Sequence, residues 1–70
     1  MILVGDMVEI QDRTGVENRA IEGQWCYVLA IIRGPMYGDY EGLLLEDIVG
    51  DKFAIPLKQV KLIKNGGINK

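Results

Sequence analysis

The chain has 70 residues and a formal net charge of −2, and 49% of its residues are hydrophobic. This length gives one small domain, and the apolar content is enough for a packed core and too high for a disordered chain. The longest apolar run, residues 25–32, is far shorter than the roughly 20 residues of a membrane-spanning helix, so we expect no membrane insertion. The opening residues lack the basic and apolar stretches of a secretory signal, and we expect a cytoplasmic protein.

Charge is distributed unevenly along the chain. Residues 1–51 hold all ten carboxylates and three arginines, whereas residues 52–70 hold five lysines and no acid. A basic end beside an acidic body would steer a partner through a dipolar field. The alternative is an ordinary solvated surface on which lysines pair with neighbouring acids.

The first predicted strand is Met7–Ile10, in which Val8 and Ile10 alternate with Met7 and Glu9. A period of two residues indicates a half-buried strand, and we expect Val8 and Ile10 to face the core.

Residues 11–24 form a polar stretch that is long for a connection within a compact domain. Loops of this length usually carry function when they are ordered, so we expect this one to provide partner-facing surface. Its candidate binding residues are Arg13, Glu17 and Arg19.

Residues 25–32 are rich in aromatic and β-branched side chains, which predicts a central strand buried on both faces or nearly so. Trp25 and Tyr27 share one face of that strand, and we expect both to pack in the core. Arg33 ends the strand, and a Gly-Pro pair follows it.

The turn at residues 34–39 provides a second candidate surface. Met36, Tyr37 and Tyr40 lie in or near it, and exposed aromatic side chains beside a methionine are typical of interfaces. The alternative is a loop folded over the end of the core.

Residues 40–45 predict the third strand, in which Gly42 marks a bend or bulge. A helical turn over residues 43–49 is the alternative, but the flanking glycines and the missing cap favour a strand. Gly50 and Asp51 then predict a tight hairpin turn.

Residues 52–55 predict the fourth strand, with Phe53 and Ile55 facing inward. Pro56 has no N–H to donate, so the strand must end there. Residues 57–59 then have the length of one 3₁₀ turn.

The last predicted strand begins at Val60, and we expect Val60 and Leu62 to face inward and Lys61 outward. Residues 65–70 carry no apolar pattern. We therefore expect one domain over residues 1–64 and a flexible tail over residues 65–70.

This order of parts resembles the SH3-like barrels. The resemblance rests on Gly5-Asp6-Met7-Val8-Glu9-Ile10, the long loop, the middle strands and Ile55-Pro56-Leu57-Lys58-Gln59-Val60-Lys61-Leu62-Ile63, and it covers residues 5–63. It implies an all-β, small five-stranded barrel with a short 3₁₀ turn before the last strand. The same order of parts recurs in KOW-type domains of ribosomal and transcription proteins and in small accessory subunits of photosynthetic complexes, and the resemblance is one of architecture only.

Two departures limit what the resemblance implies about function. KOW domains carry a glycine-rich basic segment after the first strand, where this chain has Asp12, Glu17 and Glu22 beside two arginines. The Ala-Leu-Tyr-Asp-Tyr run and the tryptophan pair of signalling SH3 domains are absent, so binding of proline-rich peptides does not carry over.

The residues that enzymes commonly use are scarce in this chain. It has no histidine, and its one cysteine, Cys26, lies in the most apolar run, where we expect it to be a core residue. Glu46 and Asp47 are adjacent, which on a strand sends them to opposite faces and suits no paired acid–base role. No spacing of carboxylates matches a metal loop. We therefore expect neither catalysis nor a cofactor.

Two functions remain for such a chain. The first is a protein-binding module or small accessory subunit that docks on a larger complex through its loops or an open strand edge. The second is a KOW-like nucleic-acid-binding domain in which Arg13, Arg19, Arg33 and the C-terminal lysines contact phosphates. Exposed strand edges also favour self-association.

Overall fold

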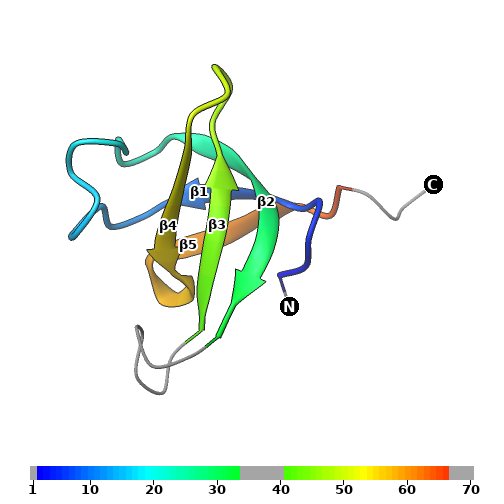
Figure 1. The fold of residues 1–70 in the computed structure, drawn as a ribbon. Helices are drawn as coiled ribbons and strands as arrows, with labels where there is room; N and C mark the ends of the chain where they lie inside the picture. The colour runs from blue at the N-terminus through cyan, green and yellow to red at the C-terminus, as the bar shows by residue number, and fades with distance from the viewer. Residues whose placement is uncertain (1, 34–40, 67–70) are drawn as a thin grey trace.

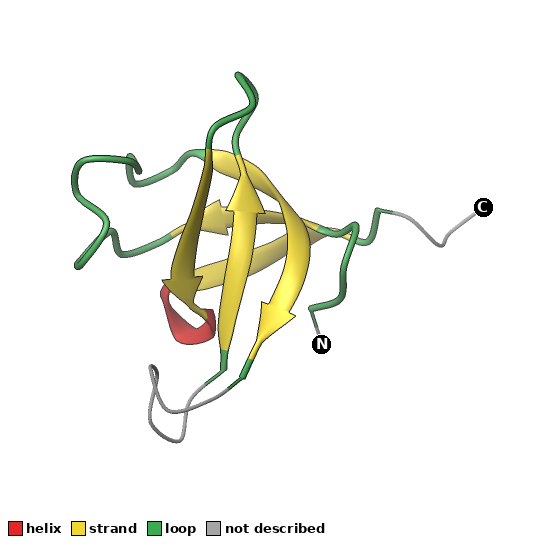
Figure 2. Ribbon diagram, viewed as in Figure 1, coloured by secondary structure: helices red, strands yellow, loops and turns green. Residues whose placement is uncertain are grey.

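The structure is a computed structural model, and it describes residues 2–33 and 41–66. Within these ranges the chain is all-β, with one antiparallel sheet and one 3₁₀ turn (Figure 2), as predicted. The elements are β1 (Met7–Ile10), β2 (Trp25–Ile32), β3 (Gly42–Glu46), β4 (Lys52–Pro56), η2 (Leu57–Gln59) and β5 (Val60–Lys64). None of the described residues belongs to a helix that is long and apolar enough to cross a membrane.

The strands pair in the order β4-β3-β2-β1-β5, so β2 is the central strand, as expected. The sheet curls strongly, and β1 and β5 cross behind β3 and β4 (Figure 1). The edge strands β4 and β5 are joined by η2 alone. In the part of the chain that the structure describes, no ladder joins β4 to β5, so the sheet is open.

The core lies between the two halves of the curled sheet. Val8 and Ile10 of β1 are fully buried, which confirms the alternation predicted for the first strand. Phe53 and Ile55 of β4 are buried as well, again as expected. The remaining buried apolar residues are Ala20, Cys26, Val28, Leu43, Leu45 and Val60.

The curl depends on an irregularity in the central strand. Between the pairs Val28–Leu45 and Ala30–Leu44, β2 contains one residue, Leu29, that has no partner on β3. Such a bulge bends a strand and increases its twist. We expected this feature at Gly42, but the register of β3 is continuous there, because Gly42 pairs with Ile32 and Pro56. The bulge in this ladder therefore lies in β2, and a second irregularity lies in β5, where Ile63 has no partner on β1.

The third strand continues to Glu46, which excludes the helical turn over residues 43–49. The hairpin that follows spans residues 47–51 and is longer than the predicted two-residue turn. The buried carboxylate of Asp47 organises it by accepting hydrogen bonds from the N–H groups of Val49 and Asp51, at 3.0 and 2.9 Å. Gly50 has φ +96, a conformation that side-chain-bearing residues rarely adopt.

The end of the chain follows the prediction closely. β4 ends at Pro56, η2 covers residues 57–59, and β5 begins at Val60. Leu62 pairs with the buried Val8 and shares its face of the sheet, but its side chain is 36% exposed because β5 is an edge strand. Residues 67–70 of the predicted tail, and Tyr40 of the predicted third strand, lie outside the described residues.

Candidate functional site

The loop between β1 and β2, predicted to face a partner, is folded onto the domain. Its first part is a turn in which the Asp12 carboxylate accepts hydrogen bonds from the Thr14 hydroxyl and the Thr14 N–H, at 2.6 and 3.0 Å. Its second part is one helical turn, closed by the Ala20 N–H donating to the Val16 carbonyl. Ala20 is buried and Val16 packs against the core, so the loop has a fixed position.

Gln59 of η2 anchors this loop. Its side-chain Nε2 donates to the carbonyl oxygens of Asp12 and Thr14, at 2.7 and 3.0 Å. Its own carbonyl accepts hydrogen bonds from the N–H groups of Gln11 and Asp12. Residues that are far apart in sequence are thus held together, and the loop is fixed relative to β4 and η2.

Two loop carboxylates have lowered pKa values for the same local reason. Hydrogen bonds from the Thr14 hydroxyl and N–H lower the pKa of Asp12. Hydrogen bonds from its own N–H and from the Gly15 N–H lower the pKa of Glu17. Both carboxylates therefore stabilise the loop in their charged forms, and nothing in their surroundings suits them to act as acids in catalysis.

A groove of about 420 Å³ runs between this loop and the edge strand β4. Residues 15–19 line one side and residues 52–54 line the other. Two of the predicted binding residues, Glu17 and Arg19, lie in this groove, whereas Arg13 does not. Met36, Tyr37 and Tyr40 lie outside the described residues.

The expectation that Trp25 and Tyr27 pack in the core is wrong. Cys26 and Val28 face the core instead, which leaves Trp25 50% exposed and Tyr27 46% exposed on the other side of the sheet. The first half of β2 is therefore buried on one face only. Tyr27 pairs with Met7 on β1, so the three side chains share one surface, here termed the outer face (Met7, Trp25 and Tyr27).

Charged pairs flank the outer face on both sides. On one side, Glu46 pairs with Tyr27 in the sheet and lies 3.8 Å from the Lys52 Nζ. On the other, Glu9 pairs with Trp25 and lies 3.7 Å from the Lys61 Nζ. The surface thus has an apolar centre and a charged rim.

The tip of the β3–β4 hairpin adds further apolar surface at the same end of the sheet. Ile48 and Val49 are 83% and 75% exposed. Because Glu46 pairs with Tyr27, the hairpin begins at the level of Cys26 and lies near Trp25. The charge of Asp47 raises the pKa of the Cys26 thiol, which agrees with this placement.

Cys26 is a core residue, as predicted, and is 1% exposed. Burial raises the pKa of its thiol to about 11, and the Asp47 carboxylate acts in the same direction. At neutral pH the thiol is protonated, which makes it a poor nucleophile. Over residues 2–33 and 41–66, no three acidic or cysteine side chains converge to hold a metal ion.

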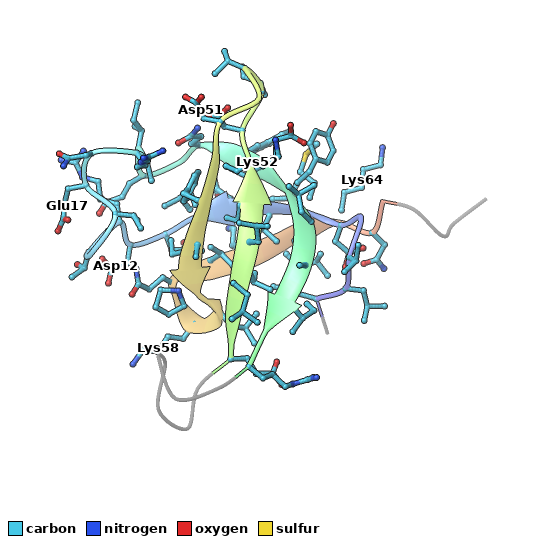
Figure 3. The ribbon with its side chains drawn as sticks, viewed as in Figure 1. Asp12, Glu17, Asp51, Lys52, Lys58 and Lys64 are labelled. Atoms are coloured by element: carbon cyan, nitrogen blue, oxygen red, sulfur yellow. The ribbon has the colours of Figure 1, made fainter. Side chains whose placement is uncertain are left out.

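The lysines that the structure describes in the C-terminal region do not lie together. Figure 3 shows Lys52, Lys58 and Lys64 on different sides of the domain. Lys52 and Lys61 each lie within ion-pair distance of a glutamate. Arg33, the remaining cation of the nucleic-acid hypothesis, pairs with Glu41 at 2.9 Å.

No protein-family model, curated protein sequence or solved structure matches this chain. The candidate surfaces are thus assigned from their own chemistry.

Sequence reasoning missed the outer face because the run of residues 25–32 is apolar throughout and shows no alternation. The signal that could have found it was indirect. Glu9 alternates with Val8 and Ile10, so it faces away from the core. A strand paired with β1 must place its own outward residues beside Glu9, but which residues those are depends on a register that the sequence does not display.

Proposed function

We propose that the chain is an SH3-like barrel that acts as a non-enzymatic protein-binding module, docking as a small accessory subunit on a larger complex. The strand order β4-β3-β2-β1-β5 supports the barrel, as does the 3₁₀ turn that joins the two edge strands. Closure of such a sheet brings its two edges towards each other, and η2 spans that short distance.

The outer face is the observation that carries the proposed function. Tryptophan and tyrosine supply a large share of the binding energy at protein interfaces, mainly where a surrounding ring of polar residues excludes water. Trp25 and Tyr27 are half exposed, and the Glu9–Lys61 and Glu46–Lys52 pairs lie on either side of them. An apolar centre with a charged rim is the usual composition of a docking surface for a folded protein.

The rigidity of this surface also favours docking. Trp25, Tyr27 and Met7 project from the two central strands of the sheet, β2 and β1, whose opposite faces form the core. Side chains on such strands lose little conformational freedom when a partner binds, which lowers the entropic cost of association. The dispersed and paired lysines give no comparable support to binding of nucleic acid.

Photocrosslinking in the source cells tests this function. We would place a photoreactive benzoylphenylalanine at position 27, irradiate the cells and identify adducts by mass spectrometry. The expected product is one discrete adduct with a larger protein. Trp25→Ala in the same chain should strongly reduce its yield, because the substitution removes the tryptophan of the outer face.

The same photoreactive residue at Arg13, an exposed loop position outside both the outer face and the groove, is the matched control. It should give no such adduct. Equal adducts from both positions would contradict docking through the outer face. An adduct of twice the mass of the chain would show that the outer face binds a second copy of the chain and not a larger complex.

A further inference from the structure

The outward side of β4 is an unpaired strand edge, and its hydrogen-bonding groups can be assigned. The Leu57 N–H donates to the Glu41 carbonyl, and the Asp47 N–H donates to the Asp51 carbonyl, each at 2.9 Å. These bonds fix the phase of the β3–β4 ladder, in which hydrogen-bonded and non-hydrogen-bonded pairs alternate. The backbone groups of Lys52 and Ala54 consequently point away from β3.

The backbone of Pro56 points away from β3, as do the backbones of Lys52 and Ala54, because the three residues alternate along the strand. Its missing N–H would have pointed outward, so the proline removes no hydrogen bond from the ladder. The edge thus offers the N–H groups of Lys52 and Ala54 as donors. A second β4 edge would bring another Lys52 beside a groove whose net charge is already positive, which argues against a second copy as the occupant.

The groove described above lies directly along this edge. Residues 15–19 form its other wall, yet no backbone hydrogen bond within the described chain runs from that wall to Lys52 or Ala54. The N–H groups of Val16, Arg19 and Ala20 donate to carbonyl oxygens within the loop. They are therefore not available to pair with β4. Among the described residues, the outward edge of β4 is therefore unpaired along the groove at residues 52–54.

The side chains that line the groove include two cations, Arg19 and Lys52, and one carboxylate, Glu17, so the net charge of the groove is positive. The Glu17 carboxylate accepts a hydrogen bond from the Gly15 N–H at 3.1 Å. Lys52 lies 3.8 Å from Glu46. Over residues 2–33 and 41–66, the side chain of Arg19 has neither an ion pair nor a hydrogen bond. An incoming segment would thus meet a guanidinium that is available to a carboxylate.

We propose that β4 binds an extended, acidic peptide segment of a partner by strand addition. The backbone of that segment pairs with Lys52 and Ala54, and one of its carboxylates contacts Arg19. Main-chain hydrogen bonds supply affinity in this mode, and side chains at alternate positions supply specificity. The site is separate from the outer face, so it adds a second binding surface to the proposed function and does not depend on it.

Synthetic peptides test the proposal on the full chain. The probe is the capped peptide Thr-Val-Glu-Val-Thr, and the comparison peptide has lysine in place of glutamate. We expect saturable downfield shifts of the Lys52 and Ala54 amide protons in NMR spectra, with the glutamate peptide binding about two- to fivefold more tightly, as for an exposed ion pair. No saturable shift of these amides with either peptide would overturn the proposal.

N-methylated peptides identify the backbone pairing. An added strand uses the N–H groups of alternate residues, so methylation in one phase should weaken binding about tenfold, and methylation in the other should leave it nearly unchanged. Equal effects in both phases would overturn strand addition. Shifts confined to Trp25 and Tyr27 would do so as well, because they would place the peptide on the outer face.

Arg19→Glu should reverse the preference, so that the lysine peptide binds more tightly than the glutamate peptide. Arg13→Glu makes the same change of charge in the same loop but outside the groove, and it should leave the preference unaltered. A preference that survives Arg19→Glu would overturn the role of Arg19. Ala54→Pro removes an outward N–H and should abolish binding. Because that variant risks misfolding, the Arg19→Glu and N-methyl results decide the proposal without it.

Discussion

The carboxylate of Asp6 joins the two ends of the domain, because its Oδ1 accepts a hydrogen bond from the N–H of Gly66, sixty residues later, at 3.1 Å. Its other oxygen accepts from the Leu3 N–H at 2.8 Å. Asp6 is 1% exposed, its N–H donates to the Leu3 carbonyl, and its carbonyl accepts from the Val28 N–H. One buried side chain thus fixes both the segment before β1 and the segment after β5.

Asp6→Ala should therefore destabilise the whole domain. The substitution removes two part-buried hydrogen bonds, from the Leu3 and Gly66 N–H groups, and bonds of this kind contribute about 1 kcal/mol each. We expect the free energy of unfolding in urea to fall by about 2 kcal/mol. Asp51→Ala is the matched control, since Asp51 is exposed and its carboxylate makes no hydrogen bond within the described residues. Equal losses in the two variants would contradict the role of Asp6.

Gly66→Ala should weaken the same junction from the other side. A Cβ at this position would overlap the Gly5 carbonyl oxygen, so residue 66 would have to move away from the Asp6 carboxylate. Because the chain after β5 can detach without disturbing the sheet, we expect a smaller loss of stability than for Asp6→Ala. Faster hydrogen exchange at residue 66 is the direct readout. The neighbouring substitution Asn65→Ala should change neither quantity.

The Asp6–Gly66 contact illustrates what the sequence could not predict. Alternation located β1, and Pro56 with the three residues after it located the end of β4 and the 3₁₀ turn, because these signals are local. Gly66 was assigned to a flexible tail because nothing near it in sequence indicates a partner. A hydrogen bond across sixty residues depends on the assembled fold.

The groove and the outer face were hidden for related reasons. Arg19 was predicted as a binding residue from the polarity and length of its loop, but Lys52 and Ala54 were assigned only to a strand. They become part of a site because β4 is an edge strand that lies beside the loop, which is a property of sheet order. On β2, every residue of the run 25–32 is apolar, so no alternation indicates which face is buried.

The Cys26 thiol should make stability depend on alkaline pH. Its pKa is raised by burial to about 11 in the folded protein, from about 9 in the unfolded chain. A raised folded pKa stabilises the fold fully below pH 9, and that stabilisation is lost as the pH rises towards 11.

We expect the difference in unfolding free energy between the natural chain and Cys26→Ala to change with a slope of up to about 1.4 kcal/mol per pH unit in this window. Lysines and tyrosines titrate there as well, so this difference, rather than either curve alone, is the measurement. A difference that stays constant from pH 8 to 11 would contradict the raised pKa.

The β1–β2 loop should loosen at acid pH before the sheet unfolds. The pKa values of Asp12 and Glu17 are lowered by hydrogen bonds within the loop, so their contribution is present above the ordinary carboxyl values of 3.8 and 4.5 and is lost as the pH falls through the folded values. NMR titration should show chemical shifts of residues 12–17 changing while those of residues 28–32 of β2, which contain no carboxyl group, remain constant. Thr14→Ala removes one donor to Asp12 and should return the pKa of that carboxyl towards 3.8. Simultaneous changes in the loop and the sheet would contradict a local role.

Gln59→Ala should release the β1–β2 loop and leave the sheet in place. The Gln59 side chain donates to the carbonyls of Asp12 and Thr14, whereas β5 pairs with β1 through its backbone. We expect hydrogen exchange to accelerate over residues 12–20, with exchange in β2 and β3 unchanged and a loss of about 1 kcal/mol in unfolding free energy.

Because the loop forms one wall of the groove beside β4, the glutamate peptide should bind Gln59→Ala more weakly, although no residue of the groove has changed. Lys64→Ala, on β5 and far from Asp12 and Glu17 in Figure 3, is the comparison variant, and it should retain slow exchange in the loop. If Gln59→Ala left exchange over residues 12–20 unaltered, the burial of Ala20 would be sufficient to hold the loop, and the side chain of Gln59 would have no positioning role.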